Sequence, residues 1–192
     1  MRKQLGISVR LVIVMTVLTG FLYPGIVTGL CQWLFPTTAN GSLIRVNGRV
    51  VGSSLIGQNF TKPDHFHPRP SAAGGGYDAS NSGGSNYGPT NQKLIDRVKN
   101  SIAEFRKANP DYKGPIPADL VTTSASGLDP DISLASAEAQ ADRVAVARDV
   151  PLEEVRRLIR QHTEERELGF LGGPRVNVLE LNLALDVRFP RH

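Results

Sequence analysis

The longest uncharged run in the chain lies near its N-terminus. No Asp, Glu, Lys or Arg occurs between Arg10 and Arg45, and 17 of the 25 residues at positions 11–35 are apolar. A helix over residues 11–34 is about 36 Å long, which exceeds the hydrocarbon thickness of a bilayer, roughly 30 Å. The run lacks the polar face of a buried core helix, and it is longer than the about 7–15 apolar residues of a signal peptide. The sequence therefore predicts an uncleaved transmembrane anchor at residues 11–35.

The charges around this run predict its orientation. Arg2, Lys3 and Arg10 flank its N-terminal end, whereas the other end has no charged residue until position 45. Cytoplasmic flanks carry an excess of Lys and Arg. We therefore expect residues 1–10 to be cytoplasmic and residues 36–192 to form an extracytoplasmic domain.

The overall charge argues against a nucleic-acid partner. The chain has 22 Lys and Arg against 18 Asp and Glu, and 19 of the basic residues follow Arg10, so the body is close to neutral. A nucleic-acid-binding surface needs a basic patch, and the sequence contains no such cluster. Cys31 is the only cysteine, which excludes an intrachain disulfide and a cysteine-rich metal site.

Two glycines give the predicted anchor a face without bulky side chains. Gly25 and Gly29 are four residues apart. This spacing lets a second membrane helix approach closely, which predicts a helix-packing surface. The alternative is that Pro24 and Gly25 only mark a kink.

The remaining sequence predicts a single α+β domain. Asn47-Gly48, between two β-prone runs at residues 43–51, indicates a hairpin with a type I′ turn. Apolar spacing and capping residues predict helices at residues 91–108 and 133–148, and a third helix beginning at Pro151. Alternating leucines at residues 176–185 favour a closing strand, with a helix as the alternative.

Residues 63–91 are poor in apolar side chains and rich in Gly, Ser and Asn. Such a segment cannot bury much surface on its own account. It is expected to be a long surface loop or a binding surface.

Histidines offer the best candidates for a metal or catalytic site. His65 and His67 would share one face of a strand, as two zinc ligands do, but a catalytic zinc site usually needs a third protein ligand. His162 falls at helical spacing among apolar residues, and His192 is at the tail. A half-buried or surface histidine without a ligand role is therefore preferred.

Other reactive patterns are incomplete. The sequence has no Gly-x-Ser-x-Gly elbow and no Gly-x-x-x-x-Gly-Lys-Ser/Thr phosphate loop. Asp119, Asp129 and Asp131 do not follow the spacing of an EF-hand, and turns or helix caps are the expected roles. We therefore expect an anchored binding domain without a catalytic, cofactor or metal site.

Several motifs, in this order, resemble one family. They are Gly52-Ser53-x-Leu55-Ile56-Gly57-Gln58-x-Phe60, Phe66-x-Pro68-Arg69-Pro70-Ser71-Ala72, Gly83-Gly84-Ser85-Asn86-x-Gly88-Pro89-Thr90-Asn91, Pro117-x-Asp119-Leu120-Val121, Ser126-Gly127-Leu128-Asp129-Pro130-x-Ile132-Ser133, Arg143-Val144-Ala145-x-Ala147-Arg148 and Gly172-x-Pro174-Arg175-Val176-Asn177-Val178-Leu179-x-Leu181-Asn182. The sequence resembles the KdpC family, the C subunits of bacterial potassium-importing P-type ATPases, from the anchor to about Asp186. It departs from that pattern at Asp131 and Gly173, which puts a functional role of these two positions in doubt.

The resemblance implies a non-catalytic subunit in the bacterial inner membrane. It implies three partners: a potassium-conducting A subunit, an ATP-hydrolysing B subunit and a small F subunit. The chain would stabilise their assembly, while ATP and potassium are handled by the complex. The family is also credited with ATP binding, which conflicts with an extracytoplasmic domain and with the missing phosphate loop. A membrane-anchored hydrolase and a solute-sensing domain are the alternatives.

The Gly/Ser/Asn-rich loop at residues 69–91 is the predicted interface with the partner subunits. Its expected contact residues are Arg69, Ser71, Ser85, Asn86 and Asn91. The alternative for Arg69, which lies between two prolines, is an internal salt bridge to an acidic residue of the same domain.

Overall fold

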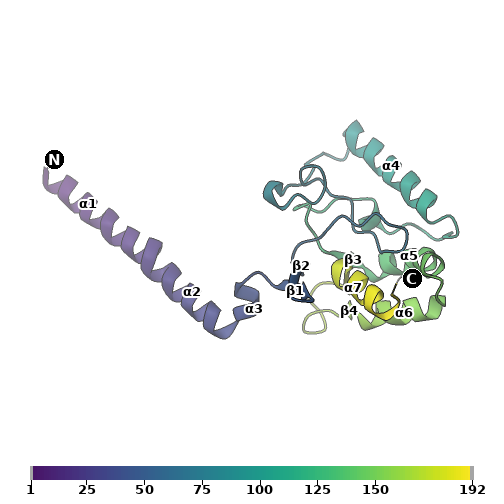
Figure 1. Ribbon diagram of the computed structural model, residues 1–192. Helices are drawn as coiled ribbons and strands as arrows, with labels where there is room; N and C mark the ends of the chain where they lie inside the picture. The colour runs from purple at the N-terminus through teal and green to yellow at the C-terminus, as the bar shows by residue number, and fades with distance from the viewer. Residues whose placement is uncertain (1, 191–192) are drawn as a thin grey trace. The chain divides into compact units, whose positions relative to one another are not determined.

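The computed structural model describes residues 2–190. Met1, Arg191 and His192, which belong to the predicted cytoplasmic and extracytoplasmic ranges, lie outside it. The chain divides between Val51 and Gly52 into two compact units. Figure 1 shows an N-terminal unit dominated by helix and a second unit of mixed helix and sheet. Each unit is described by itself below.

One long helix forms most of the N-terminal unit. It consists of α1 (Arg2–Thr16), the π-helical segment η1 (Val17–Leu22) and α2 (Tyr23–Leu34). Its 33 residues correspond to a length of about 50 Å at 1.5 Å per residue. The prediction of an N-terminal helix long and apolar enough to cross a membrane is confirmed.

The π-helical segment has a local cause in the sequence. Pro24 occupies the first turn of α2 and has no N–H, and its ring would clash with the carbonyl of Gly20 in a regular helix. The backbone N–H of Tyr23 instead donates to the carbonyl of Leu18, five residues earlier. One wide turn therefore absorbs the proline without ending the helix.

The predicted hairpin follows the helix and a short helical turn, α3 (Pro36–Ala39). Strands β1 (Leu43–Val46) and β2 (Arg49–Ser53) pair with each other. Asn47 and Gly48 between them have φ angles of 51° and 78°. These are the positive values that a type I′ turn requires, so the hairpin prediction is confirmed.

The second unit contains a small antiparallel sheet in the order β3-β5-β4. Ile132 of β3 pairs with Val176 of β5, and Val176 pairs in turn with Thr163 of β4. The elements, in chain order, are η2 (Ala79–Asn81), α4 (Gln92–Ala108), η3 (Ala118–Leu120), β3 (Asp131–Ser133), α5 (Leu134–Arg148), α6 (Leu152–Gln161), β4 (Thr163–Glu164), β5 (Arg175–Asn177) and α7 (Val178–Arg188).

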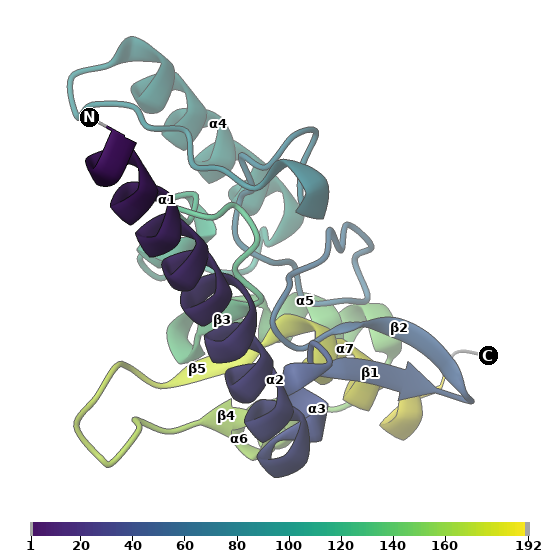
Figure 2. The ribbon, with the colours of Figure 1, turned by 90° about the vertical axis from the view of Figure 1, so that its left-hand side faces the viewer.

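The main core lies where α5, α6 and α7 pack together beside this sheet (Figure 2). Small residues on α5 allow this close approach, because an alanine side chain extends little beyond the backbone. The fully buried members come from every one of these elements, and they include Ile132, Ala141, Val144, Val155, Ile159, Val176, Leu181 and Leu185. The prediction of a mixed helix-and-strand domain is confirmed.

Side-chain caps fix where the predicted helices begin. Asn91 accepts a hydrogen bond of 2.9 Å from the N–H of Lys93 at the start of α4. Ser133 Oγ accepts one of 3.1 Å from the N–H of Ser136 at the start of α5. Such caps satisfy N–H groups that have no partner within the helix. The predicted helices beginning at residues 91, 133 and 151 are all present.

The prediction of a strand at residues 176–185 is wrong beyond its first two residues. Strand β5 ends at Asn177, whose side chain accepts a hydrogen bond of 3.1 Å from the N–H of Glu180 and so caps α7. The buried residues Val178, Leu181 and Leu185 recur at helical spacing. Alternating leucines misled the prediction because Leu179 is buried as well.

Arg148, at the end of α5, connects the C-terminal segment to the loop that precedes the sheet. Its side chain is 2% exposed. The guanidinium donates to the carbonyl of Asp64 at 2.6 Å, to the carbonyl of Phe189 at 3.1 Å and to the carboxylate of Asp186 at 2.8 Å. One buried cation thus joins α5, α7 and the 62–67 segment.

Candidate partner-binding groove

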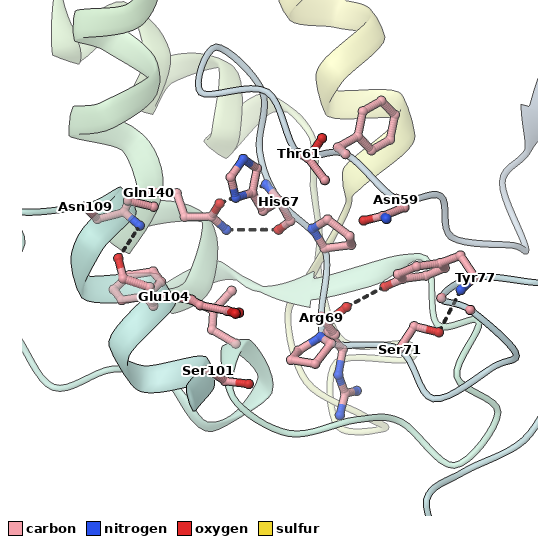
Figure 3. Close-up of a pocket in the computed structure, with 18 residues that line it drawn as sticks. Asn59, Thr61, His67, Arg69, Ser71, Tyr77, Ser101, Glu104, Asn109 and Gln140 are labelled. Carbon is pink, nitrogen blue, oxygen red and sulfur yellow. Dashed lines mark hydrogen bonds between the residues drawn. The ribbon is translucent and has the colours of Figure 1, made fainter. Parts of the chain in front are cut away.

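A groove of about 460 Å³ separates α4 from the loop at residues 59–77 (Figure 3). Helix α4 contributes Ser101, Glu104 and Phe105, and Gln140 comes from α5. The loop provides the opposite wall with Asn59, Phe60, Thr61, His67, Pro68, Arg69, Pro70, Ser71, Gly75, Gly76 and Tyr77. The groove is therefore lined by both polar and apolar groups and lies against the predicted interface loop.

Arg69 lies on the loop wall of the groove and forms an ion pair with Asp129. Its Nη1 is 2.5 Å from Asp129 Oδ2, and both side chains are about one quarter exposed. This is the internal salt bridge that the sequence left open as an alternative. Arg69 Nε is buried, and none of the residues at positions 2–190 accepts its hydrogen bond. Because this Nε is enclosed by the domain, only the exposed quarter of the Arg69 side chain can be reached from outside.

Ser71 organises the loop behind this wall. Its Oγ donates to the carbonyl of Gly127 at 2.6 Å and accepts from the N–H groups of Ala73 at 3.1 Å and Tyr77 at 2.8 Å. One hydroxyl thus connects two turns of the loop to a segment 56 residues away. Three hydrogen bonds to backbone groups indicate a structural role.

Tyr77 completes the same wall by closing back on Arg69. Its hydroxyl donates a hydrogen bond of 2.8 Å to the Arg69 carbonyl. Burial, followed by the nearby Asp129 carboxylate, raises the pKa of Tyr77 well above its ordinary value, so the hydroxyl remains a donor. Gly57 lies directly beneath the ring, where an added Cβ would stand 2.4 Å from Tyr77 Cε1.

The glycine-rich end of the loop is paired with residues 124–127. The N–H of Gly83 donates to the carbonyl of Ser126 at 2.9 Å, and Ser82 Oγ donates to the same oxygen at 3.0 Å. Gly84 is packed so closely that an added Cβ would lie 2.8 Å from the carbonyl of Ala125. The domain's own backbone therefore orders a segment that buries few side chains.

The remaining predicted interface residues lie outside the groove lining. Ser85 is half-buried and Asn86 is exposed, with a φ of 51° at Asn86. Asn91 is exposed and caps α4. Arg69 and Ser71 therefore both line the groove, whereas Ser85, Asn86 and Asn91 do not.

The two histidines of the 64–67 segment are both engaged by the protein. His65 Nδ1 is 3.0 Å from Asp64 Oδ1, and its Nε2 is 3.6 Å from Asp186 Oδ2. His67 Nε2 lies 3.0 Å from the carbonyl of Lys62, which makes this nitrogen the donor. Burial first, and then the Arg143 guanidinium, lower the pKa of His67 and favour the neutral ring.

A metal site is not assembled in the described part of the chain. Within residues 2–190, no three His, Cys, Asp or Glu side chains come close enough to hold an ion. His162 lies at the end of α6 rather than beside His65 and His67. The fourth histidine lies outside the described residues.

Asp119 and Asp129 have the roles expected of caps and turns, whereas Asp131 lies in strand β3 and forms an ion pair. Asp119 accepts from the N–H of Ser133 at 2.7 Å and from Ser136 Oγ at 2.6 Å, which fixes the start of α5. Asp129 accepts from the N–H of Asp131 at 3.1 Å. Burial and the neighbouring Asp129 raise the pKa of Asp131, whose carboxylate lies 3.2 Å from Arg175 Nε. Gly173 is in open space.

Sequence reasoning did not place three of the lining residues in a site. Gln140 is 1% exposed, donates to the carbonyl of His67 at 3.1 Å and accepts from its N–H at 2.8 Å. The only sequence feature that points to Gln140 is that a polar side chain falls on the buried side of α5. Tyr77 and Glu104 gave no signal, because their positions depend on contacts between distant segments.

The glycines of the predicted helix-packing face lie in the N-terminal unit. Gly25 and Gly29 are both in α2, and an added Cβ at either position would meet no atom within 4 Å. The face is therefore open within this unit, as a helix-packing surface requires.

Comparison with known proteins identifies the family. The family model described as "KdpC: K+-transporting ATPase, c chain" matches residues 5–187. The potassium-transporting ATPase KdpC subunit of Koribacter versatilis is 56% identical over 187 residues, covering 97% of this chain and 95% of that protein. The KdpC subunit of Caulobacter vibrioides is 60% identical over 176 residues, covering 91% and 88%. That of Mycobacterium bovis is 52% identical over 187 residues, covering 97% and 99%. The resemblance inferred from the sequence motifs is thus confirmed, and the chain belongs to the KdpC family, the c chain of K+-transporting ATPases.

Proposed function

We propose that this chain is the non-catalytic accessory subunit of an ATP-driven, high-affinity potassium import complex, and that it stabilises the assembly of that complex. The observation that carries the proposal is the family match over residues 5–187, which includes both the apolar helix and the folded domain. The relatives that cover nearly the whole chain are named as KdpC subunits of potassium-transporting ATPases.

Catalysis and ATP binding are assigned to another subunit of the complex. Two features support this assignment. His65 lies 3.0 Å from the carboxylate of Asp64, and His67 is hydrogen-bonded to the carbonyl of Lys62. The N–H groups of Gly76 and Gly83, which a phosphate-binding loop would need, donate to the carbonyls of Ala73 and Ser126.

The proposed location is the bacterial inner membrane. Arg2, Lys3 and Arg10 favour a cytoplasmic N-terminus, which would place the folded domain outside the cytoplasm. The partners would be a potassium-conducting A subunit, an ATP-hydrolysing B subunit and a small F subunit. With this topology, the domain is on the opposite side of the membrane from cytoplasmic ATP.

Two surfaces are proposed to make the contacts that stabilise the complex. The first is the open face of α2 at Gly25 and Gly29, which allows another helix to approach closely. The second is the groove wall around Arg69, whose side chain is 23% exposed beside its ion pair with Asp129. A carbonyl or carboxylate on the outer face of a partner would bind the exposed part of this side chain. Ser85 and Asn86 extend this surface along the same loop.

Affinity purification tests this function. A tagged full-length chain, extracted from membranes in mild detergent, is expected to bring with it a channel-like membrane protein and a P-type ATPase in equal amounts. The same preparation should hydrolyse ATP in response to potassium, and omission of this chain should reduce both the yield of the complex and the activity. A chain that purifies alone, with partners that assemble normally in its absence, would contradict the proposal.

A further inference from the structure

The loop between β4 and β5 carries an exposed apolar tip. Leu168 is 83% exposed, Phe170 is 69% exposed and Leu171 is 48% exposed. Figure 2 shows this yellow-green loop extending away from the sheet and from the helices of its unit. Large apolar side chains grouped at the end of a protruding loop indicate a contact outside the domain.

The tip is a defined turn whose exposure is fixed by its backbone. Glu167 and Leu171 exchange two hydrogen bonds, of 3.0 and 2.9 Å, and the N–H of Gly169 donates to the carbonyl of Arg166 at 3.0 Å. Leu168 has a φ of 53°, a conformation that non-glycine residues adopt only when their surroundings impose it. The turn therefore holds Leu168 and Phe170 outward in one arrangement.

Two of the acidic residues next to the tip are ion-paired with Arg175. Arg175 Nη2 lies 2.7 Å from Glu164 Oε2 and 3.7 Å from Glu167 Oε1. Residues 164–167 contain three glutamates and one arginine. The local charge is therefore negative, which gives the tip no attraction to anionic surfaces.

We propose that this tip, residues 168–171, inserts into the interfacial region of the bilayer that anchors the chain. The proposal rests on the membrane anchoring described under the proposed function. Only 17 residues separate Leu34 at the end of α2 from Gly52 at the start of the folded unit. A chain of that length spans at most about 60 Å, so the domain is confined near the membrane surface. Tethering gives even a weak lipid contact a high effective concentration.

The size of the tip favours lipid over a protein partner. A fully buried Phe contributes about 150–250 Å², so Phe170 and the two smaller leucines together offer on the order of a few hundred Å². A stable protein interface buries about 1,200–2,000 Å². Leu and Phe on a turn suit the boundary between headgroups and acyl chains, where apolar groups enter about 5–10 Å deep.

Fluorescence quenching by lipids tests this contact in the full chain. Trp33 is the only tryptophan, so Trp33→Phe combined with Phe170→Trp places a single reporter on the tip. The protein is reconstituted into phosphatidylcholine vesicles that contain phosphatidylcholine brominated near the headgroup. We expect the emission of the tip reporter to fall at least about twofold, as for a group at interfacial depth. Matched controls place the reporter at Val146 or Val187, which are 80% and 82% exposed on helices of the same unit, and these should retain their emission.

The unmodified chain separates failure of the tip from failure of the anchor. Quenching of Trp33 in α2 reports whether the helix enters the bilayer. If Trp33 is quenched and the tip reporter is not, the lipid contact is wrong and the anchored subunit stands. If Trp33 is not quenched, both proposals fall. Equal quenching at the tip, Val146 and Val187, or shielding of the tip only after partner subunits are added, would also overturn the lipid contact.

Discussion

Ser71 Oγ donates a hydrogen bond of 2.6 Å to the carbonyl of Gly127, and it does so while accepting from two N–H groups of its own loop. This contact explains how a segment with few buried side chains has one conformation. Ordering each residue of a loop costs roughly 1–2 kcal/mol. In this loop the cost is offset by hydrogen bonds to residues 124–129 rather than by a hydrophobic core.

Replacing Ser71 with Ala should therefore destabilise the domain. The change leaves half-buried N–H and carbonyl groups without their partner, which costs about 1–3 kcal/mol. Urea unfolding of the full chain in mild detergent, followed by near-ultraviolet circular dichroism, measures the effect. Ser80→Ala is the matched control, because Ser80 is exposed and its hydroxyl bonds only to exposed Asp78. Equal midpoints for the two variants would show that Ser71 does not hold the loop.

Arg69 and Asp129 provide a test that separates stability from partner binding. Their ion pair is half-buried, so a double-mutant cycle with Arg69→Ala and Asp129→Ala should give a coupling energy of about 1 kcal/mol in unfolding. If the exposed part of the Arg69 side chain also contacts a partner, Arg69→Ala should lower the yield of co-purified complex more than Asp129→Ala does. Arg69→Lys serves as a control that keeps the charge and lacks the planar guanidinium. Equal yields for both alanine variants would restrict Arg69 to its internal role.

The open face of α2 leads to a prediction on assembly. Gly25→Leu combined with Gly29→Leu preserves hydrophobicity, so membrane insertion should survive, while close approach of a second helix is lost. The amount of partner subunits that co-purify should fall at least severalfold. Gly6→Leu, also an open helical glycine, is the control and should have no effect. If the double variant gives the wild-type yield of co-purified partners, this face does not contribute to the interface.

His67 predicts a pH dependence of stability. Burial and Arg143 lower its pKa from the ordinary value of 6.5, so the unfolded chain binds this proton more readily than the folded domain does. The stability contribution is fully present above pH 6.5 and is lost as the pH falls toward the folded-state pKa. His67→Gln should weaken the decline in urea midpoint between about pH 7.5 and about pH 5.5, because it removes the titrating group. Parallel declines in wild type and variant would contradict this, and His162→Gln serves as the control.

Local signals in the sequence were sufficient for much of the fold. Asn47-Gly48 indicated the hairpin, and Asn91 and Ser133 marked the helix starts, because each of these effects depends on a few neighbouring residues. The prediction of a strand at residues 176–185 failed because the buried leucines fit both a period of two and a helical period over this short stretch. The cap at Asn177 was the signal that could have decided it.

The groove could not be predicted from the sequence, because contacts between distant segments form it. Arg69 was singled out by its flanking prolines, but its partner Asp129 lies 60 residues away and was expected only to form a turn or a helix cap. Gln140 and Glu104 enter the groove from two different helices. Such long-range pairings are set by the packing of the whole domain rather than by local propensity.

The wide turn at Val17–Leu22 has a consequence for comparing this chain with its relatives. A π-helical turn is equivalent to one extra residue inserted into an α-helix, and each residue rotates the helix by about 100°. Gly25 and Gly29 therefore point in a direction that depends on this turn. A relative without a proline at position 24 would need one residue fewer in this stretch to present the same side of its helix. Alignment gaps there would be compensations that preserve the direction of a face. A single-residue deletion in Val17–Leu22 that left the wide turn in place would rotate α2 by about 100° relative to α1.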